Sequence, residues 1–212
     1  MKSSRFTIVL ALLCCLAVSR AQELKEIQLP APQIDIGKPL MQALKLRKSS
    51  RSFDSKPLPL QELSNLLWAA NGINRPEFGK RTAPSAMNWQ EVDIYVALPQ
   101  ALYLYEARTN SLAAIVAKDL RGATGQQGFV KDAPVNLVYV VDFDRVKSAS
   151  DDDRKLTTAD VGFIAQNVYL YCASQGLAVV VRGSIDRRSL AEAMKLRPEQ
   201  NIILAQTVGY PK

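Results

Sequence analysis

The sequence contains no histidine among its 212 residues, and this absence excludes several kinds of site. Ser-His-Asp and Cys-His nucleophile pairs, histidine zinc ligands and imidazole acid–base catalysis are all ruled out. Cysteine is scarce as well, with Cys14 and Cys15 near the amino end and Cys172 alone after them. Any chemistry must use carboxylates, Lys, Tyr, Ser, a thiol or a bound cofactor. We predict no catalytic side chain and no metal site.

Residues 1–21 have the pattern of a secretory signal peptide. Lys2 and Arg5 precede an apolar run over 6–18, and Ser19-Arg20-Ala21 resembles a cleavage site before Gln22. The run is short for a membrane span, so no stable span is expected after cleavage. We therefore expect a secreted or periplasmic protein.

Three further expectations follow from the signal peptide. Lipidation is less favoured, because Leu13 precedes Cys14 where a lipoprotein signal places a small residue. Cleavage would leave Cys172 as the only thiol, which excludes an internal disulfide. The pattern includes no twin-arginine pair, so we expect export of the unfolded chain, with any ligand acquired afterwards.

The charge balance is modestly basic. The whole chain has 27 Lys and Arg against 20 Asp and Glu, and removal of residues 1–21 leaves 24 basic residues against 20 acidic ones. No Lys/Arg run or basic stripe with interleaved aromatic residues is present, so we expect no nucleic-acid partner. The excess of positive charge suits a small anionic ligand.

Proline and apolar spacing divide the rest of the chain into an arm and one domain. Residues 22–39 contain three prolines and predict an extended arm, and residues 40–212 predict a single domain. Apolar stripes predict helices, and apolar runs or alternation predict strands. The predicted helices are 40–46, 60–71, 158–175 and 187–196, and the predicted strands are 92–96, 102–105, 112–116, 135–141, 177–181 and 201–208.

Two polar connections predict loops. Residues 118–132, which contain three glycines, predict a mobile flap over a site. Residues 145–155 predict a charged loop, in which Asp151-Asp152-Asp153 form a solvated turn. They lack the alternating spacing of a calcium loop.

The segment Arg47-Lys48-Ser49-Ser50-Arg51-Ser52-Phe53-Asp54 has the composition of a phosphate site. Two arginines around a serine pair supply fixed positive charge and hydroxyl donors, which form charge-assisted hydrogen bonds with a phosphate monoester. Taken alone, these residues are also compatible with a solvated turn between two helices.

Four segments together resemble the flavin-dependent nitroreductase-like superfamily, and most closely its branch of SagB-type dehydrogenases. These segments are 47–54, 66–75 together with Arg81-Thr82-Ala83-Pro84-Ser85-Ala86, 160–176, and Gly209-Tyr210-Pro211. The resemblance implies an α+β fold with a mainly antiparallel sheet surrounded by helices. It also implies a homodimer with FMN at the subunit interface.

The resemblance assigns ten cofactor-binding residues. Arg47, Lys48, Ser49 and Arg51 would hold the phosphate and ribityl chain. Pro84, Ser85 and Asn88 would contact the flavin ring edge or ribityl chain. The turn Arg182-Gly183-Ser184 would offer backbone N–H groups near the reactive flavin nitrogen.

Two departures from the family pattern concern the cofactor site. The basic pair of a C-terminal extension is expected to be absent or reduced to Lys212. Asn88-Trp89-Gln90-Glu91-Val92 replaces the Asn-x-Gln-Pro-Trp sequence of many members, which affects the expected ring contacts and substrate shape.

The resemblance implies an exported FMN-dependent oxidoreductase that works by ping-pong electron transfer. Electrons would come from NAD(P)H or another small reductant and pass to a nitroaromatic, quinone or similar acceptor. One alternative is a non-catalytic extracytoplasmic protein on the same fold that binds a flavin or phospholigand. Another is a structural dimer that binds no ligand.

Overall fold

The computed structural model describes residues 24–148 and 150–212. The predicted signal peptide, with Cys14 and Cys15, lies outside the described residues. Within the described part of the chain, no helix has the length and apolarity that a bilayer crossing requires.

A seven-stranded sheet forms the centre of the fold, and all of its neighbouring strands are antiparallel. The strand order is β1-β6-β5-β4-β7-β9-β8. The first four strands along the chain are β1 (Ile27–Gln28), β4 (Val92–Ala97), β5 (Leu102–Glu106) and β6 (Ser111–Val116). They are followed by β7 (Val135–Asp142), β8 (Ala178–Arg182) and β9 (Gln200–Gly209).

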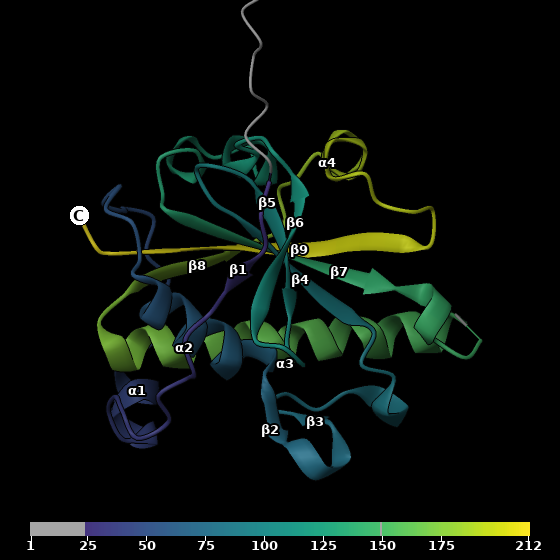
Figure 1. Ribbon diagram of the computed structural model, residues 1–212, viewed down its shortest axis with the longest axis horizontal. Helices are drawn as coiled ribbons and strands as arrows, with labels where there is room; N and C mark the ends of the chain where they lie inside the picture. Colours follow the sequence, from purple (N-terminus) through teal and green to yellow (C-terminus); the bar gives the residue numbers. More distant parts are fainter. Residues whose placement is uncertain (1–23, 149) are drawn as a thin grey trace, which may run out of the picture.

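Helices cover both faces of this sheet, as Figure 1 shows. The long helix α3 (Asp151–Gln175) crosses one face, where α1 (Leu40–Leu46) and α2 (Leu60–Asn71) pack against it. The other face carries α4 (Arg187–Met194) and the short helical turns Arg121–Thr124 and Gly128–Val130. The predicted α+β fold, with an antiparallel sheet between helices, is confirmed.

Strand β7 explains how one sheet supports two hydrophobic layers. All eight of its residues are buried. Leu137 and Tyr139 belong to the core under α2 and α3, whereas Val138 and Val140 pack with Leu190 of α4. Because successive side chains of a strand point to opposite faces, a continuous apolar run is needed to fill both layers.

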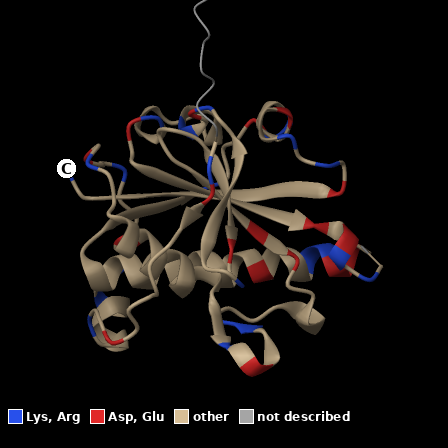
Figure 2. Cartoon of the chain, in the orientation of Figure 1, with Lys and Arg blue, Asp and Glu red and all other residues tan. Residues whose placement is uncertain are grey.

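The start of α3 differs from the sequence prediction. Residues 151–155 were predicted to belong to a loop and the helix to begin at 158, but α3 begins at Asp151. A capping box precedes the helix, in which Ser150 Oγ accepts the Asp153 N–H at 3.2 Å and Asp153 Oδ2 accepts the Ser150 N–H at 3.1 Å. The three aspartates lie in the first turn of the helix, where the positive end of the helix dipole stabilises their negative charge. The loop prediction for residues 151–155 was therefore wrong. Figure 2 shows acidic residues at this end of α3.

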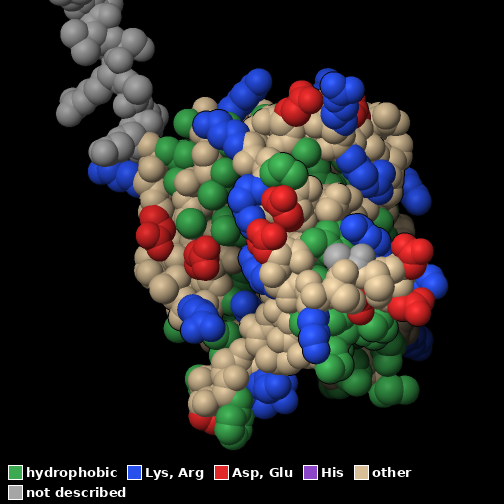
Figure 3. All heavy atoms as spheres, turned by 90° about the vertical axis from the view of Figure 1, so that its right-hand side faces the viewer, with side chains coloured by type: hydrophobic (Ala, Val, Ile, Leu, Met, Phe, Trp, Pro, Cys, Tyr) green, Lys and Arg blue, Asp and Glu red, His purple; other side chains and the backbone are tan. Residues whose placement is uncertain are grey.

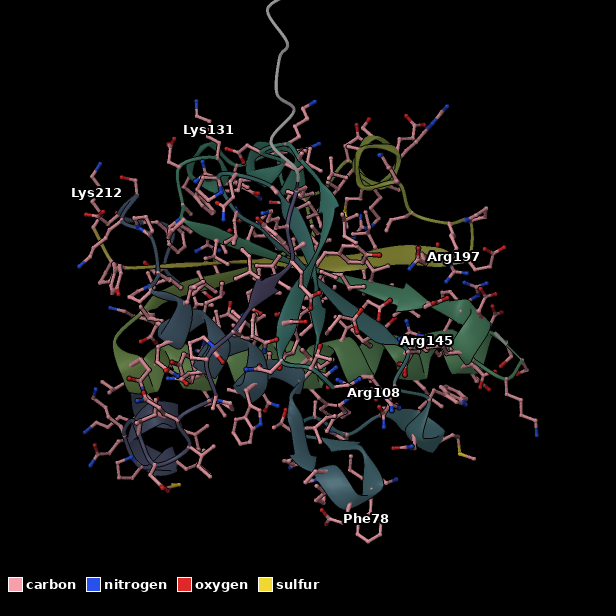
Figure 4. All side chains as sticks on the ribbon, viewed as in Figure 1. Phe78, Arg108, Lys131, Arg145, Arg197 and Lys212 are labelled. Atoms are coloured by element: carbon pink, nitrogen blue, oxygen red, sulfur yellow. The ribbon has the colours of Figure 1, made fainter. Side chains whose placement is uncertain are left out.

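A small hairpin of β2 (Ile73–Arg75) and β3 (Lys80–Arg81) follows α2. The chain passes close to Trp68 at Gly72, where an added Cβ would lie 2.4 Å from Trp68 Cδ1. Trp68 Nε1 donates to the Ile73 carbonyl at 3.0 Å and so fixes the hairpin to α2. Phe78 lies exposed in the connecting turn Pro76–Phe78 (Figure 4).

A charged cluster lies at one edge of the molecule, near the first residues of β4 and β9 and the last residue of β7. Arg145 contacts Asp93 at 2.8 Å and Asp142 at 3.4 Å, and Arg197 contacts Asp142 at 2.6 Å. Arg197 also pairs with Asp144. Figure 3 shows basic and acidic side chains next to each other on this face of the molecule. The short helical turn Phe143–Arg145 carries two of these residues.

Candidate functional site

The first part of the candidate site is the segment that leaves α1 and follows the sheet edge formed by β8. The Ser50 N–H donates to the Val179 carbonyl at 2.8 Å, and the Asp54 N–H donates to the Tyr210 carbonyl at 2.9 Å. Ser49 Oγ lies 2.8 Å from Tyr169 Oη, which also accepts the Val181 N–H at 2.9 Å. Residues 49–54 are thus tied to α3 and to both strands at this edge.

The basic side chains of this segment reach three different surroundings. The Arg47 guanidinium lies 5.4 Å from the ring centroid of Tyr169, within range of a cation–π interaction. Arg51 is exposed and lines a cavity of about 670 Å³. Lys48 lines a separate hollow of about 180 Å³ beside Ala173 of α3. Arg47 and Ser49 therefore share one location, whereas Lys48 lies apart from Arg51.

The predicted turn at 182–184 splits into a buried residue and two exposed ones. Arg182 ends β8 with only 5% of its surface exposed. Its guanidinium donates to Thr124 O at 2.7 Å, Thr207 Oγ1 at 2.9 Å and Asn136 Oδ1 at 2.9 Å. Burial lowers the pKa of Arg182 to about 10, so the side chain stays charged at neutral pH.

Gly183 and Ser184 are exposed and follow directly in the chain. Ser184 Oγ donates to Gln126 Oε1 at 2.9 Å, and the Ser184 carbonyl accepts the Gln126 N–H at 3.2 Å. Across residues 24–148 and 150–212, the N–H groups of Gly183 and Ser184 donate to no protein acceptor. The turn consequently offers two backbone donors, two and three residues after Val181, whose own N–H binds Tyr169.

The second part of the candidate site is the loop of Pro84, Ser85 and Asn88. Ser85 Oγ donates to Glu91 Oε2 at 3.0 Å and accepts the Gln90 N–H at 2.8 Å. The Ala86 N–H donates to Asp160 Oδ2 at 2.7 Å. These bonds hold the loop and its short helical turn Ala86–Asn88 against α3.

This loop has a strained backbone. Met87, Asn88 and Gln90 have φ values of 47°, 58° and 51°. Such values favour glycine, and in other residues they mark conformations that the surroundings must hold in place. Pro84 and Asn88 are exposed, and Asn88 lines a cavity of about 560 Å³.

Glu91 is a buried carboxyl group behind the loop. It is completely inaccessible, and its Oε1 has no hydrogen-bond partner among the described residues. The pKa of Glu91 is raised to about 7, mainly by burial and to a smaller extent by the neighbouring Asp160. The sequence reasoning missed both residues, because nothing in the local pattern brings position 91 next to α3.

The two parts of the candidate site lie apart within one chain. Ser49 contacts α3 at Tyr169, and Ala86 contacts α3 at Asp160. Nine residues of helix correspond to about 13–14 Å along the axis and to half a turn around it. Tyr169 and Asp160 therefore lie at opposite margins of the buried face of α3.

Comparison with known proteins identifies the family. The sequence model of the Nitroreductase family matches residues 44–210, a range that contains both parts of the site. The chain belongs to the nitroreductase family. Among curated proteins it is 33% identical over 184 residues to a Methanocaldococcus jannaschii protein named "Putative nitroreductase", a match that covers 81% of this chain and 90% of that protein.

Solved structures of nitroreductase-family proteins have the same fold. A protein from Ralstonia eutropha with the same description is 47% identical, with a TM-score of 0.84 and coverage of 88% of this chain and 90% of that one. A nitroreductase-like protein from Desulfovibrio desulfuricans, solved in complex with FMN, is 20% identical with a TM-score of 0.61. That match covers 82% of this chain and 87% of that one, and it supports the fold. The chain is thus a nitroreductase-family oxidoreductase.

Proposed function

We propose that this nitroreductase-family oxidoreductase depends on FMN. The observation that carries the proposal is that Arg47 and Ser49 both contact Tyr169. The Tyr169 hydroxyl also accepts the Val181 N–H, two residues before the Gly183–Ser184 turn. Fixed positive charge and a hydroxyl suit a phosphate and its ribityl chain. Backbone N–H groups without a protein acceptor suit the polar edge of a flavin ring.

The side chains at this end of β8 bind and orient, and none serves as an acid or base. Bound FMN supplies the hydride and electron chemistry that these side chains lack. Arg47 beside Tyr169 and Arg51 in the cavity of about 670 Å³ supply positive charge for the phosphate. Tyr169 fixes the position of Ser49 through their 2.8 Å contact. We propose ping-pong transfer from NAD(P)H or another small reductant to a nitroaromatic, quinone or similar acceptor.

The cofactor proposal is tested by the colour of the purified protein. The chain beginning at Gln22 is expressed, its visible absorption is recorded, and any released ligand is identified. A yellow protein with about one FMN per subunit supports the proposal, because one chain contains one Arg47–Arg51 segment. A colourless protein that also fails to bind added FMN contradicts the proposal. Bound FMN without turnover by an artificial donor favours the non-catalytic binding protein.

We further propose a homodimer in which the partner supplies the second part of the site. The separation of Ser49 from the Ser85 loop along α3 supports this arrangement. A partly exposed apolar surface on α1 and α3 supports it too, because Leu40, Met41, Leu44 and Phe163 lie on adjacent packed helices. Large exposed apolar surfaces commonly mark protein interfaces.

The dimer is tested with Met41→Glu, because Met41 is 75% exposed and its replacement need not disturb the core. Sedimentation should show a dimer for the parent protein and a monomer with weakened FMN binding for the variant. Lys45→Glu on the same helix is the matched control, since it changes charge without removing apolar area. A parent protein that sediments as a monomer while retaining FMN contradicts the proposal.

We also propose that the protein is exported after cleavage of residues 1–21. The support comes from the sequence pattern of that segment. Cell fractionation together with amino-terminal sequencing of the mature protein tests the proposal. An uncleaved cytoplasmic chain that begins at Met1 would refute it.

A further inference from the structure

The cavity of about 670 Å³ beside Arg51 has basic side chains from three separate parts of the chain. Arg51 comes from the segment after α1, Arg121 and Lys131 come from the connection between β6 and β7, and Lys212 follows β9. We name Arg121, Lys131 and Lys212 the basic cavity, and we keep Arg51, which also lines it, for the proposed FMN-binding segment. Figure 4 labels Lys131 and Lys212 on the same side of the molecule.

The charges of the basic cavity are only partly compensated. Arg121 pairs with Asp119 at 2.8 Å and donates to the Ala133 carbonyl at 2.9 Å. Asp54 and Asp132 also line the cavity. Within the described part of the chain, however, Arg51, Lys131 and Lys212 form no ion pair. The cavity therefore retains an excess of positive charge that an anion would balance.

An aromatic side chain forms part of the same wall. Phe129 lines the cavity and is only half-buried, and its ring centroid lies 5.4 Å from that of the buried Phe53. Ligand pockets combine apolar or aromatic surface with a few placed polar groups. A ring surface next to free cations suits a planar aromatic molecule that carries a negative group.

The buried Arg182 holds one side of the cavity in place. It donates to both the carbonyl and the hydroxyl of Thr124, at 2.7 and 3.3 Å. A Cβ added at Gly125 would lie 1.9 Å from Arg182 Nη1, so the turn fits closely over the guanidinium. Thr124 Oγ1 in turn donates to the Arg121 carbonyl at 2.8 Å. Arg182 thus positions the turn that carries Arg121.

We propose that the basic cavity binds the anionic group of an aromatic substrate of the enzyme, such as a ring carboxylate or sulfonate. This proposal rests on the proposed function, because Arg51 joins the basic cavity to the FMN-binding segment. It deepens that function by giving the substrate a chemical class. Lys131 and Lys212 bind the anion, and Phe129 contacts the ring.

The test compares 4-nitrobenzoate with the neutral 4-nitrobenzyl alcohol, using FMN-loaded enzyme and NADH as the reductant. Lys131→Ala should lower the ratio of kcat/KM for the anion to kcat/KM for the alcohol about tenfold, the effect of one lost charge-assisted hydrogen bond. Added salt should lower the same ratio in the parent protein. Lys118→Ala is the matched control, because Lys118 is exposed on the same connection but outside the cavity lining.

Two results would overturn the proposal. One is an unchanged ratio in Lys131→Ala. The other is a large loss of FMN affinity in that variant, which would assign the basic cavity to the cofactor instead.

A calorimetric titration separates this proposal from the proposed function. If the protein neither binds FMN nor turns over, the proposed function fails. Binding of 4-nitrobenzoate that weakens about tenfold in Lys131→Ala would still support the basic cavity as an anion site. Absence of 4-nitrobenzoate binding to either the FMN-loaded or the FMN-free protein refutes the site itself.

Discussion

Replacement of Glu91 by Gln should stabilise the protein at alkaline pH and have little effect at acidic pH. Glu91 is fully buried, one of its oxygens has no hydrogen-bond partner among the described residues, and burial raises its pKa from 4.5 to about 7. The folded state therefore keeps a proton that the unfolded state has already released between these two pH values. Stability from this group is complete below pH 4.5 and is lost as the pH rises through 7.

The size of the effect follows from the pKa shift. At about 1.4 kcal/mol per pKa unit, ionisation of Glu91 costs about 3 kcal/mol of folding free energy by pH 8. Glutamine has nearly the same shape, can accept the Ser85 hydrogen bond and carries no charge. Glu91→Gln should thus unfold about 6–12 °C higher than the parent at pH 8, and within about 2 °C of it at pH 4.5.

Thermal unfolding followed by circular dichroism at both pH values measures this difference. Glu77→Gln is the control, because Glu77 is exposed in the turn after β2 and its neutralisation should change little at either pH. Equal shifts of Glu91→Gln at pH 4.5 and pH 8 would show that proton linkage is not the cause. A variant less stable than the parent at pH 8 would refute the reasoning altogether.

Three further changes test other parts of the structure. Arg51→Ala should weaken FMN binding about tenfold to hundredfold through loss of a charge-assisted hydrogen bond. Arg188→Ala, at an exposed position, should leave FMN binding unchanged. Equal FMN dissociation constants for Arg51→Ala and the parent protein would exclude Arg51 as an anchor. Arg182→Met should lower the free energy of unfolding in urea by about 2–4 kcal/mol, because buried acceptors on Thr124 and Asn136 lose their donor; a variant as stable as Arg188→Met would contradict this. Burial raises the pKa of the Cys172 thiol, so in the chain from Gln22 this thiol should react with a thiol reagent only after unfolding; rapid reaction of the native protein would show that the site opens.

Helix ends were predictable where a residue type forces them. The bounds of α1 and α2 match the prediction because Pro39 and Pro59 come directly before their first residues. The start of α3 was missed because aspartates suit both a turn and the first turn of a helix. The capping bonds between Ser150 and Asp153 decide for the helix.

Short strands gave no usable signal. Strand β1 has only two residues, and its partners Ser111 and Leu112 are distant in sequence. Two or three residues are too few to form a recognisable alternation. Strands β2 and β3 were missed for the same reason, since their pairing depends on how Gly72 and Trp68 direct the chain.

The candidate site was predictable as a set of residue types but not as an arrangement. Alternation along an extended segment separates Lys48 from Arg47 and Ser49, although all three lie in one motif. The opposite margins of α3 hold the two parts of the site, which only the folded helix reveals. Glu91, Arg121 and Lys131 acquire their surroundings from distant segments, so their roles depend on tertiary structure.

The bridge between Phe53 and Pro211 sets an order of events during synthesis of the chain. The Asp54 N–H likewise forms its hydrogen bond only once the Tyr210 carbonyl has been synthesised. A ribosome makes the Arg47–Arg51 segment before it makes residues 210 and 211, which hold the neighbouring Phe53 and Asp54 in place. The contacts of Phe53 and Asp54 can therefore form only after translation has passed residue 211, and removal of residues 210–212 would loosen a segment encoded more than 150 positions earlier.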